Sequence, residues 1–169
     1  MIVGKLELDK HFEKMSHVSI RNGIEKGISL VQGAAKSNCP SFDGELRQSI
    51  YTDIEESNDI VRGFCGPNAK HGTFVELGTG PKGQANHDGI SPEVTVAYTQ
   101  DPWWIHEGPG ENEIDRSVAE HYHFPYIDTP QGRFYKCSGQ AAQPYLYPAL
   151  KDNEDEIIKM IGEEVKKQL

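Results

Sequence analysis

Two histidines spaced one residue apart are the first candidates for chemistry in this chain. His121 and His123 flank Tyr122, and Glu120 precedes them. Alternate residues of a β-strand share a face, so a strand here would let both imidazoles bind one ion, with Glu120 or Asp128 as a carboxylate ligand. Protein metal sites usually take three or four ligands, and no second cluster supplies the rest. A small metal-dependent hydrolase is therefore an alternative hypothesis, and we assign no metal.

A glycine-rich stretch at residues 78–83 spells G-x-G-x-x-G. A dinucleotide site needs a parallel strand before this pattern and a helix that begins inside it. Pro81 interrupts the stretch, and the composition of residues 84–92 predicts a loop. We interpret the pattern as a chance match and expect no cofactor.

The cysteines indicate neither a disulfide framework nor a zinc site. Cys39, Cys65 and Cys137 are far apart and form no C-x-x-C pair, so free thiols in a reducing cytoplasm are expected. Cys39 precedes Pro40, and a small buried side chain is a commoner role for it than a nucleophile. The G-x-S-x-G motif of many hydrolases does not occur. We assign no catalytic residue.

Charge and composition narrow the class of protein further. The 169 residues include 17 Lys and Arg against 26 Asp and Glu, a formal net charge of −9. Affinity for nucleic acid depends mainly on cations that meet phosphates, so specific binding to DNA or RNA is not expected. No stretch approaches the ~18 apolar residues of a membrane span, and the first residues lack the hydrophobic run of a signal peptide. With 36% hydrophobic residues and a mean hydropathy of −0.61, the core is modest, and neighbouring subunits are expected to add stability.

Apolar periodicity predicts a long helix near the beginning of the chain. Apolar residues recur three or four positions apart from Ile20 to Ala35, which predicts a helix over residues 9–36. Gly23, Gly27 and Gly33 each weaken this helix by roughly 1 kcal/mol relative to Ala. Packing against other elements must therefore stabilise it.

A second apolar stripe predicts a helix at the end of the chain. The stripe runs from Leu146 to Leu169, and Pro144 and Pro148 shape the entry to it. Acidic residues crowd its first half and lysines its end, which complements the helix dipole.

Between these helices the pattern predicts antiparallel strands. Alternation of apolar and polar residues predicts strands over residues 46–56 and 94–99. The turn residues Ser-Asn-Asp at 57–59 predict that the chain returns as a second strand over residues 60–65. A Thr-Pro-Gln-Gly turn predicts a hairpin of residues 122–128 with 133–137. Loops are expected at residues 81–92 and 106–113, and a short helical segment near Ile114 and Val118.

We therefore predict an α+β fold, in which an N-terminal and a C-terminal helix pack on one face of an antiparallel sheet. The chain is expected to form a single domain over residues 1–169, with a long loop-rich insertion at approximately residues 81–138.

The pair Trp103-Trp104, followed by Ile105, is the most informative apolar feature. Adjacent strand residues face opposite ways, so a strand would place one indole in the core and the other on the surface, where Trp is favoured at interfaces. The alternative is that both indoles are buried, one of them beneath residues 106–120. The sequence leaves both arrangements open.

Three motifs follow one another between the predicted helices. They are Cys-Pro-Ser-Phe-Asp-Gly-Glu-Leu-Arg-Gln-Ser-Ile at residues 39–50, Phe-Val-Glu-Leu-Gly-Thr-Gly at residues 74–80, and Gly-Gln-Ala-Ala-Gln-Pro-Tyr-Leu-Tyr-Pro-Ala-Leu at residues 139–150. In this order they resemble the gene-product-ten-like tail-component family of long-tailed bacteriophages, from about Phe12 to the C-terminus. The segment from Pro81 to Ser138 is longer than in compact members of that family.

The resemblance implies a minor structural protein that acts in tail completion or head–tail joining, without catalytic residues. It implies a place in the virion neck or tail, and in the host cytoplasm during assembly. We expect a homo-oligomeric ring that contacts neck, portal-adaptor or tail proteins. The candidate assembly interface is Phe74, Glu76, Trp103, Trp104 and Ile105. A prophage-encoded module that binds a host protein remains a further alternative.

Overall fold

The computed structural model describes residues 3–40, 44–57, 60–110 and 112–167, with the backbone alone for residues 3–17. The chain divides into two compact units. The first comprises the residues up to Gly72 together with those from Pro144 onward, and the second comprises Thr73–Gln143. The predicted insertion at residues 81–138 falls inside the second unit.

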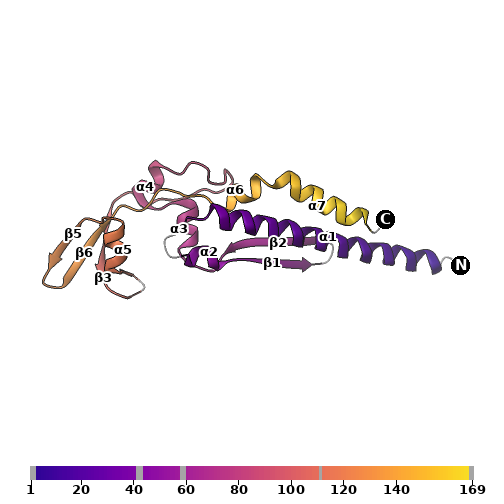
Figure 1. The fold of residues 1–169 in the computed structure, drawn as a ribbon, viewed down its shortest axis with the longest axis horizontal. Coiled ribbons are helices and arrows are strands. Elements are labelled where there is room, and N and C mark those ends of the chain that lie inside the picture. Colours follow the sequence, from indigo (N-terminus) through magenta and orange to yellow (C-terminus); the bar gives the residue numbers. More distant parts are fainter. Residues whose placement is uncertain (1–2, 41–43, 58–59, 111, 168–169) are drawn as a thin grey trace. The chain divides into compact units, whose positions relative to one another are not determined.

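The first unit is a two-stranded sheet with helices (Figure 1). Its elements are α1 (Val3–Asn38), α2 (Glu45–Ser49), β1 (Ile50–Ser57), β2 (Ile60–Pro67), α6 (Leu146–Lys151) and α7 (Glu154–Lys166). The strands pair antiparallel from Ile50 opposite Pro67 to Ser57 opposite Ile60. The helix predicted over residues 9–36 is confirmed as α1, and it is longer than expected.

Close packing at glycines holds α1 to the sheet. Gly63 of β2 has no side chain, and a Cβ built there would lie 2.8 Å from Ile28 Cδ1 and 2.9 Å from Ile24 Cγ2. The two isoleucines therefore lie directly on the strand backbone. A two-stranded sheet is marginal alone, and this apolar contact supplies the packing that it needs.

The other side of α1 receives α7. A Cβ at Gly23 would lie 2.7 Å from the Cα of Ile161, and one at Gly27 would lie 2.8 Å from Cγ2 of Ile157. Figure 1 shows the resulting layers: the β1–β2 hairpin, then α1, then α7. Both terminal helices thus lie on one side of the hairpin, with α1 in direct contact with it.

The first half of the strand predicted at residues 46–56 is helical, and that prediction is wrong. α2 begins after Gly44, whose φ of +88° is left-handed. Leu46 and Ile50 are both buried. Their spacing of four residues fits one helical turn as well as alternate strand positions, so the pattern did not distinguish the two.

The single helix predicted after Pro144 is two helices. α6 ends at Lys151, and the Asn153 side chain caps it by donating from Nδ2 to the carbonyl of Ala149 at 2.8 Å. The break shifts the helical phase, so Leu150, which the stripe placed in the core, is 53% exposed. Tyr145, immediately before α6, is fully buried and donates its hydroxyl to the Gly72 carbonyl.

The second unit is built on a four-stranded sheet. Its elements are α3 (Gly72–Leu77, which begins at the boundary), α4 (Gly80–Ala85), β3 (Trp103–Glu107), β4 (Glu113–Ile114), α5 (Arg116–His121), β5 (Tyr126–Thr129) and β6 (Gly132–Cys137). The strand order is β4-β3-β6-β5. β3–β6 and β5–β6 pair antiparallel, and the short β3–β4 pair is parallel. The hairpin predicted around the Thr-Pro-Gln-Gly turn is confirmed as β5–β6.

Two predictions for this unit are wrong. Residues 94–99 form no strand, because their alternating side chains find no partner strand; Tyr98 instead donates its hydroxyl to the Leu77 carbonyl at 2.8 Å. The loop predicted at residues 81–92 begins inside α4, with Pro81 in the first turn, where a missing backbone N–H costs nothing. The α+β class is confirmed by the helices and sheets of both units.

Replacement of Gly23 by Ala should lower stability. The new Cβ would meet a backbone atom of α7, which cannot rotate away. The cost of about 1–3 kcal/mol for overpacking exceeds the gain of about 1 kcal/mol in helix propensity. Urea unfolding followed by circular dichroism should show a lower midpoint. Gly27→Ala should cost less, since it meets only the end of the Ile157 side chain.

Gly33 provides a matched control on the same helix. Nothing lies within 4 Å of a Cβ built there, so Gly33→Ala should raise the free energy of unfolding by up to about 1 kcal/mol. If Gly23→Ala proved as stable as Gly33→Ala, the close approach of α7 to α1 would be contradicted.

Candidate functional site

The histidine pair does not form the predicted site. His121 is the last residue of α5, and His123 lies in the following turn with φ of +53°. The two imidazoles therefore do not share a strand face, and the His121 ring packs edge-on against Tyr122. Within the described part of the chain, no group of three or more His, Cys, Asp or Glu side chains is placed to hold a metal ion.

The glycine-rich stretch has a structural role. Helix α3 precedes it, and Gly78 and Gly80 adopt left-handed φ values of +75° and +59°. These turns bring Thr79 against Gln140, where each backbone N–H donates to the other residue's carbonyl at 2.9 and 3.1 Å. Without a parallel strand before it, the stretch lacks the framework of a dinucleotide site.

The three cysteines are free thiols, as predicted. Cys39 and Cys137 are buried and Cys65 is half-buried. Burial raises the pKa of each thiol above its ordinary value. Since the thiolate is the nucleophilic form, the raised pKa disfavours nucleophilic reactivity at these thiols.

The candidate interface residues have unequal exposure. Phe74 on α3 is 55% exposed, whereas Glu76 on the same helix is only 8% exposed and presents little to a partner. On β3, Trp104 is 48% exposed, and its neighbours Trp103 and Ile105 are half-buried. Trp103 points the other way, with its ring 2.8 Å from a Cβ built on Gly80. Of the two arrangements left open for the tryptophans, the structure has the one with a single indole on the surface.

Strand register assigns the remaining side chains of this sheet to two faces. Directly opposite residues share a face, and Trp104 pairs with Lys136. His106 pairs with Phe134, which in turn pairs with Ile127 of β5. These residues form what we call the outer face: Trp104, His106, Ile127, Phe134 and Lys136. Trp104, Ile127 and Lys136 are exposed there, and the other two are half-exposed.

The inner face of the sheet is covered by α5, which Figure 1 draws beside β3 and β6. Tyr135 of β6 is 1% exposed, and Ala119 of α5 is fully buried. α5 begins at Asp115, whose carboxylate accepts a hydrogen bond from the Ser117 N–H at 2.8 Å. That cap fixes where the helix starts along the sheet.

A polar network ties α5 to the inner face. Arg116 donates to both carboxylate oxygens of Glu107, at 2.9 and 3.2 Å, and the Tyr135 hydroxyl donates to the same carboxylate at 2.7 Å. These donors hold the pKa of Glu107 below its ordinary value. Arg133 binds Asp128 with two hydrogen bonds across the β5–β6 hairpin and likewise lowers the pKa of that carboxyl.

A pocket of about 360 Å³ opens between α5 and the inner face. Its walls are mainly aromatic, and the Arg133 guanidinium lies 4.0 Å above the Tyr126 ring. The lining residues are Ala119, Glu120, His123, Phe124, Tyr126, Arg133 and Tyr135. Sequence reasoning missed this pocket, because it depends on the register of β6 against β5 and on where α5 starts.

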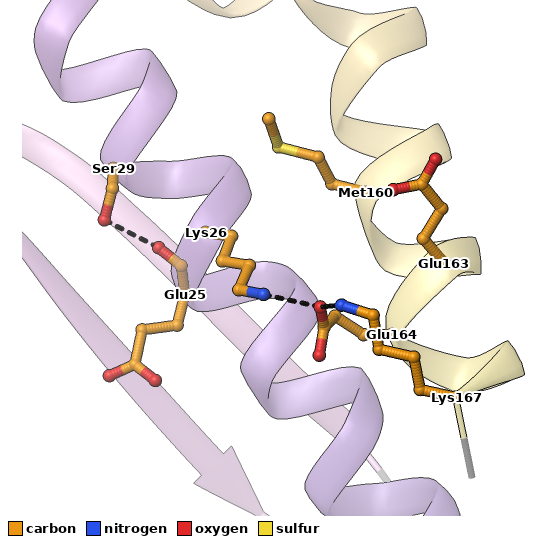
Figure 2. Close-up of a pocket in the computed structure, with 7 residues that line it drawn as sticks. All are labelled: Glu25, Lys26, Ser29, Met160, Glu163, Glu164 and Lys167. Atoms are coloured by element: carbon orange, nitrogen blue, oxygen red, sulfur yellow. Dashed lines mark hydrogen bonds and ion pairs between the residues drawn. The ribbon is translucent and has the colours of Figure 1, made fainter.

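A second pocket, of about 420 Å³, lies along the seam of α1 and α7 in the first unit (Figure 2). Lys26 of α1 and Lys167 beyond α7 both place Nζ 2.5 Å from Oε1 of Glu164. Their charges hold the pKa of Glu164 below its ordinary value. The lysines are exposed, and such surface pairs contribute little stability. Because both ammonium groups already bind the Glu164 carboxylate, this groove offers no evident ligand site.

His106 connects two loops at the edge of the outer face. Its Nδ1 lies 3.0 Å from Glu113 Oε1, and its Nε2 lies 3.3 Å from the Gln131 carbonyl oxygen. Both partners accept hydrogen bonds, so the ring satisfies both contacts in its imidazolium form, in which both nitrogens carry protons. The Glu113 carboxylate also accepts the Gly110 N–H at 2.8 Å and thereby holds the loop before β4.

Comparison of the chain with protein-family models, curated proteins and solved structures found no match. No helix in the described residues is long and apolar enough to cross a membrane. The exposed outer face and the pocket on the inner face of the four-stranded sheet are the features that bear on function.

The His106–Glu113 pair should stabilise the loop only within a pH window. The hydrogen bond to Glu113 raises the pKa of His106 above its ordinary 6.5 and lowers that of Glu113 below its ordinary 4.5. The histidine contribution is complete below pH 6.5 and is lost as pH rises through its raised pKa. The glutamate contribution is present above pH 4.5 and is lost as pH falls through its lowered pKa.

NMR titration of the His106 ring measures this pairing. The midpoint should lie above 6.5 and should fall in Glu113→Gln, because the hydrogen bond to Glu113 is the largest cause of the raised pKa of His106 and Glu107 is a smaller one. Glu93→Gln, in the loop between α4 and β3, should leave the midpoint unchanged. An unaltered midpoint in Glu113→Gln would show that the pair does not form.

Proposed function

We propose that this protein is a non-enzymatic structural component of a tailed bacteriophage or prophage, which acts in tail completion or head–tail joining. In this role it packs against copies of itself in a ring and contacts neck, portal-adaptor or tail proteins. The observation that carries the proposal is the outer face of the second unit, on which both Trp104 (48%) and Ile127 (46%) are exposed. Exposed tryptophan on an apolar patch is typical of protein interfaces.

The sheet edges support the same role. β5 ends the four-stranded sheet on one side, and β1 and β2 each have one neighbour only. Free strand edges are templates for pairing with another chain, and soluble monomers usually protect them. The apolar Ile60 and Phe64 of β2 are also exposed. A protein whose edges and faces are covered in an assembly has no need of such protection.

The charge is compatible with a component of a DNA channel. A net charge of −9 gives a surface that repels phosphate, past which DNA slides without binding. The ordered motifs that resemble the tail-component family supply the viral context. The alternative of a metal-dependent hydrolase has lost the strand that would have aligned His121 and His123.

The proposal predicts concentration-dependent assembly. Light scattering coupled to size exclusion should show a mass well above the 18.9 kDa of one chain, and negative-stain images should show rings. In the parent phage, deletion of the gene should leave heads and tails unjoined or tails incomplete, and expression in trans should restore particles.

A protein that stays monomeric at high concentration, together with intact tailed particles from the deletion phage, would refute the proposal. Elemental analysis separates the hydrolase alternative, which requires stoichiometric metal. Recovery of host proteins only, without portal or tail partners, would favour the host-binding module.

A further inference from the structure

The two faces of the four-stranded sheet carry complementary features. The outer face presents a knob, the indole of Trp104, which is 48% exposed. The inner face presents a cavity, the pocket of about 360 Å³ between the sheet and α5. Because Trp104 and the pocket wall residue Tyr135 lie on opposite faces, one copy cannot fill its own pocket with its own indole.

We infer that Trp104 of one copy inserts into the α5 pocket of the next copy. This inference rests on the proposed ring assembly and names the contact that builds it. The pocket volume lies within the range of roughly 300–1,000 Å³ typical of ligand sites. Phe124, Tyr126 and Tyr135 line it, and aromatic rings pack favourably in edge-to-face and offset arrangements.

Charge complementarity supports a second copy as the occupant. Lys136 lies directly opposite Trp104 on the outer face, and Glu120 of α5 lines the pocket. Neither side chain forms an ion pair with another described residue of its own chain. When the indole of one copy enters the pocket of the next, the Lys136 ammonium beside it approaches the Glu120 carboxylate, and the two charges form an ion pair between the copies.

The contact is head-to-tail. Each copy uses its outer face toward one neighbour and its inner face toward the other, so every added copy leaves a free knob at one end and an open pocket at the other. Such heterologous contacts close into rings where the rotation per subunit permits, whereas a two-fold dimer would use the same patch twice.

Paired variants test this geometry. Trp104→Ala removes the knob and keeps the pocket, and Tyr126→Ala removes an exposed pocket wall and keeps the knob. Each variant alone should raise the dissociation constant of self-association by about 30-fold or more, as expected for an interface hot spot. Mixed in equal amounts, they should form one-to-one dimers and nothing larger, because only one productive contact remains. An isologous Trp104–Trp104 contact predicts homodimers of the Tyr126→Ala variant and no mixed dimer.

Charge exchange provides a rescue. Lys136→Glu and Glu120→Lys should each weaken assembly, and the double variant should regain it, since every contact again pairs opposite charges. Ile158→Ala, which removes an exposed apolar residue (62%) of α7 in the first unit, is the matched control and should assemble like the parent. Circular dichroism of each variant checks that the fold is kept.

Fluorescence reports the burial directly. The chain has two tryptophans, so Trp103→Phe leaves Trp104 as the sole indole, and its emission should shift to the blue as the concentration rises.

Unchanged assembly of Trp104→Ala and no blue shift would overturn the inference while rings of the parent protein would still support the proposed function. A parent protein that never self-associates overturns the inference. If Trp104→Ala blocked particle formation in the phage without affecting self-association, the indole would dock a different virion protein, and the second-copy occupant would be wrong.

Discussion

The pairing of β3 with β6 is the constraint on which the second unit depends. Side chains alternate between faces, so this register decides that Trp104 is outside and that Tyr135 is inside. A slip by one residue would bury Lys136 beneath α5 and expose Tyr135. The Tyr135 hydroxyl on Glu107 and the Arg116 pair on the same carboxylate oppose that slip, because both would be lost. Hydrogen bonds on the inner face therefore help to set which side chains lie on the outer face.

Close approach at glycine plays the corresponding role in the first unit. Sequence reasoning identified Gly23 and Gly27 as weak points of a long helix and concluded that packing must offset them. The structure supplies the packing: Ile161 and Ile157 of α7 occupy the space that side chains at these positions would take. Glycine at these positions lowers the helix propensity of α1, but its lack of a side chain is what allows α7 to approach so closely. The exposed Gly33 has no such contact, and nothing in the structure explains it.

Elements whose sequence carries a clear local pattern were predictable. The periodic stripe of α1, the turn residues before β2 and the turn of the β5–β6 hairpin are each local patterns that few other structures would produce. The strand prediction was wrong at residues 46–50 because a spacing of four fits both the helical period and the strand period. Residues 94–99 failed for a different reason: alternation indicates a half-buried strand only if a partner edge is available, and that is a property of the whole fold.

The candidate site was only partly predictable for the same reason. The adjacent tryptophans raised the question of which indole is exposed, and local geometry could not answer it. The pocket brings α5 and β6 together from separate segments, so no single motif announces it. His121 and His123 misled because their spacing is meaningful only on a strand, and Asp115 starts a helix that ends at His121.

The second unit has too little structure of its own to bury both faces of its sheet. One six-residue helix, α5, covers the inner face, and the outer face has no covering element among the described residues of this unit. A single sheet gains stability when both of its apolar surfaces are removed from water, yet Trp104 and Ile127 remain exposed. A second copy of the same protein can cover these two side chains, and no other kind of protein is then needed. Trp104 and the pocket lie on opposite faces of the sheet. In the proposed assembly, a copy whose pocket covers the indole of its neighbour therefore still has its own indole exposed. In the proposed assembly, a ring in which the last copy meets the first would leave neither the indole nor the pocket of any copy exposed.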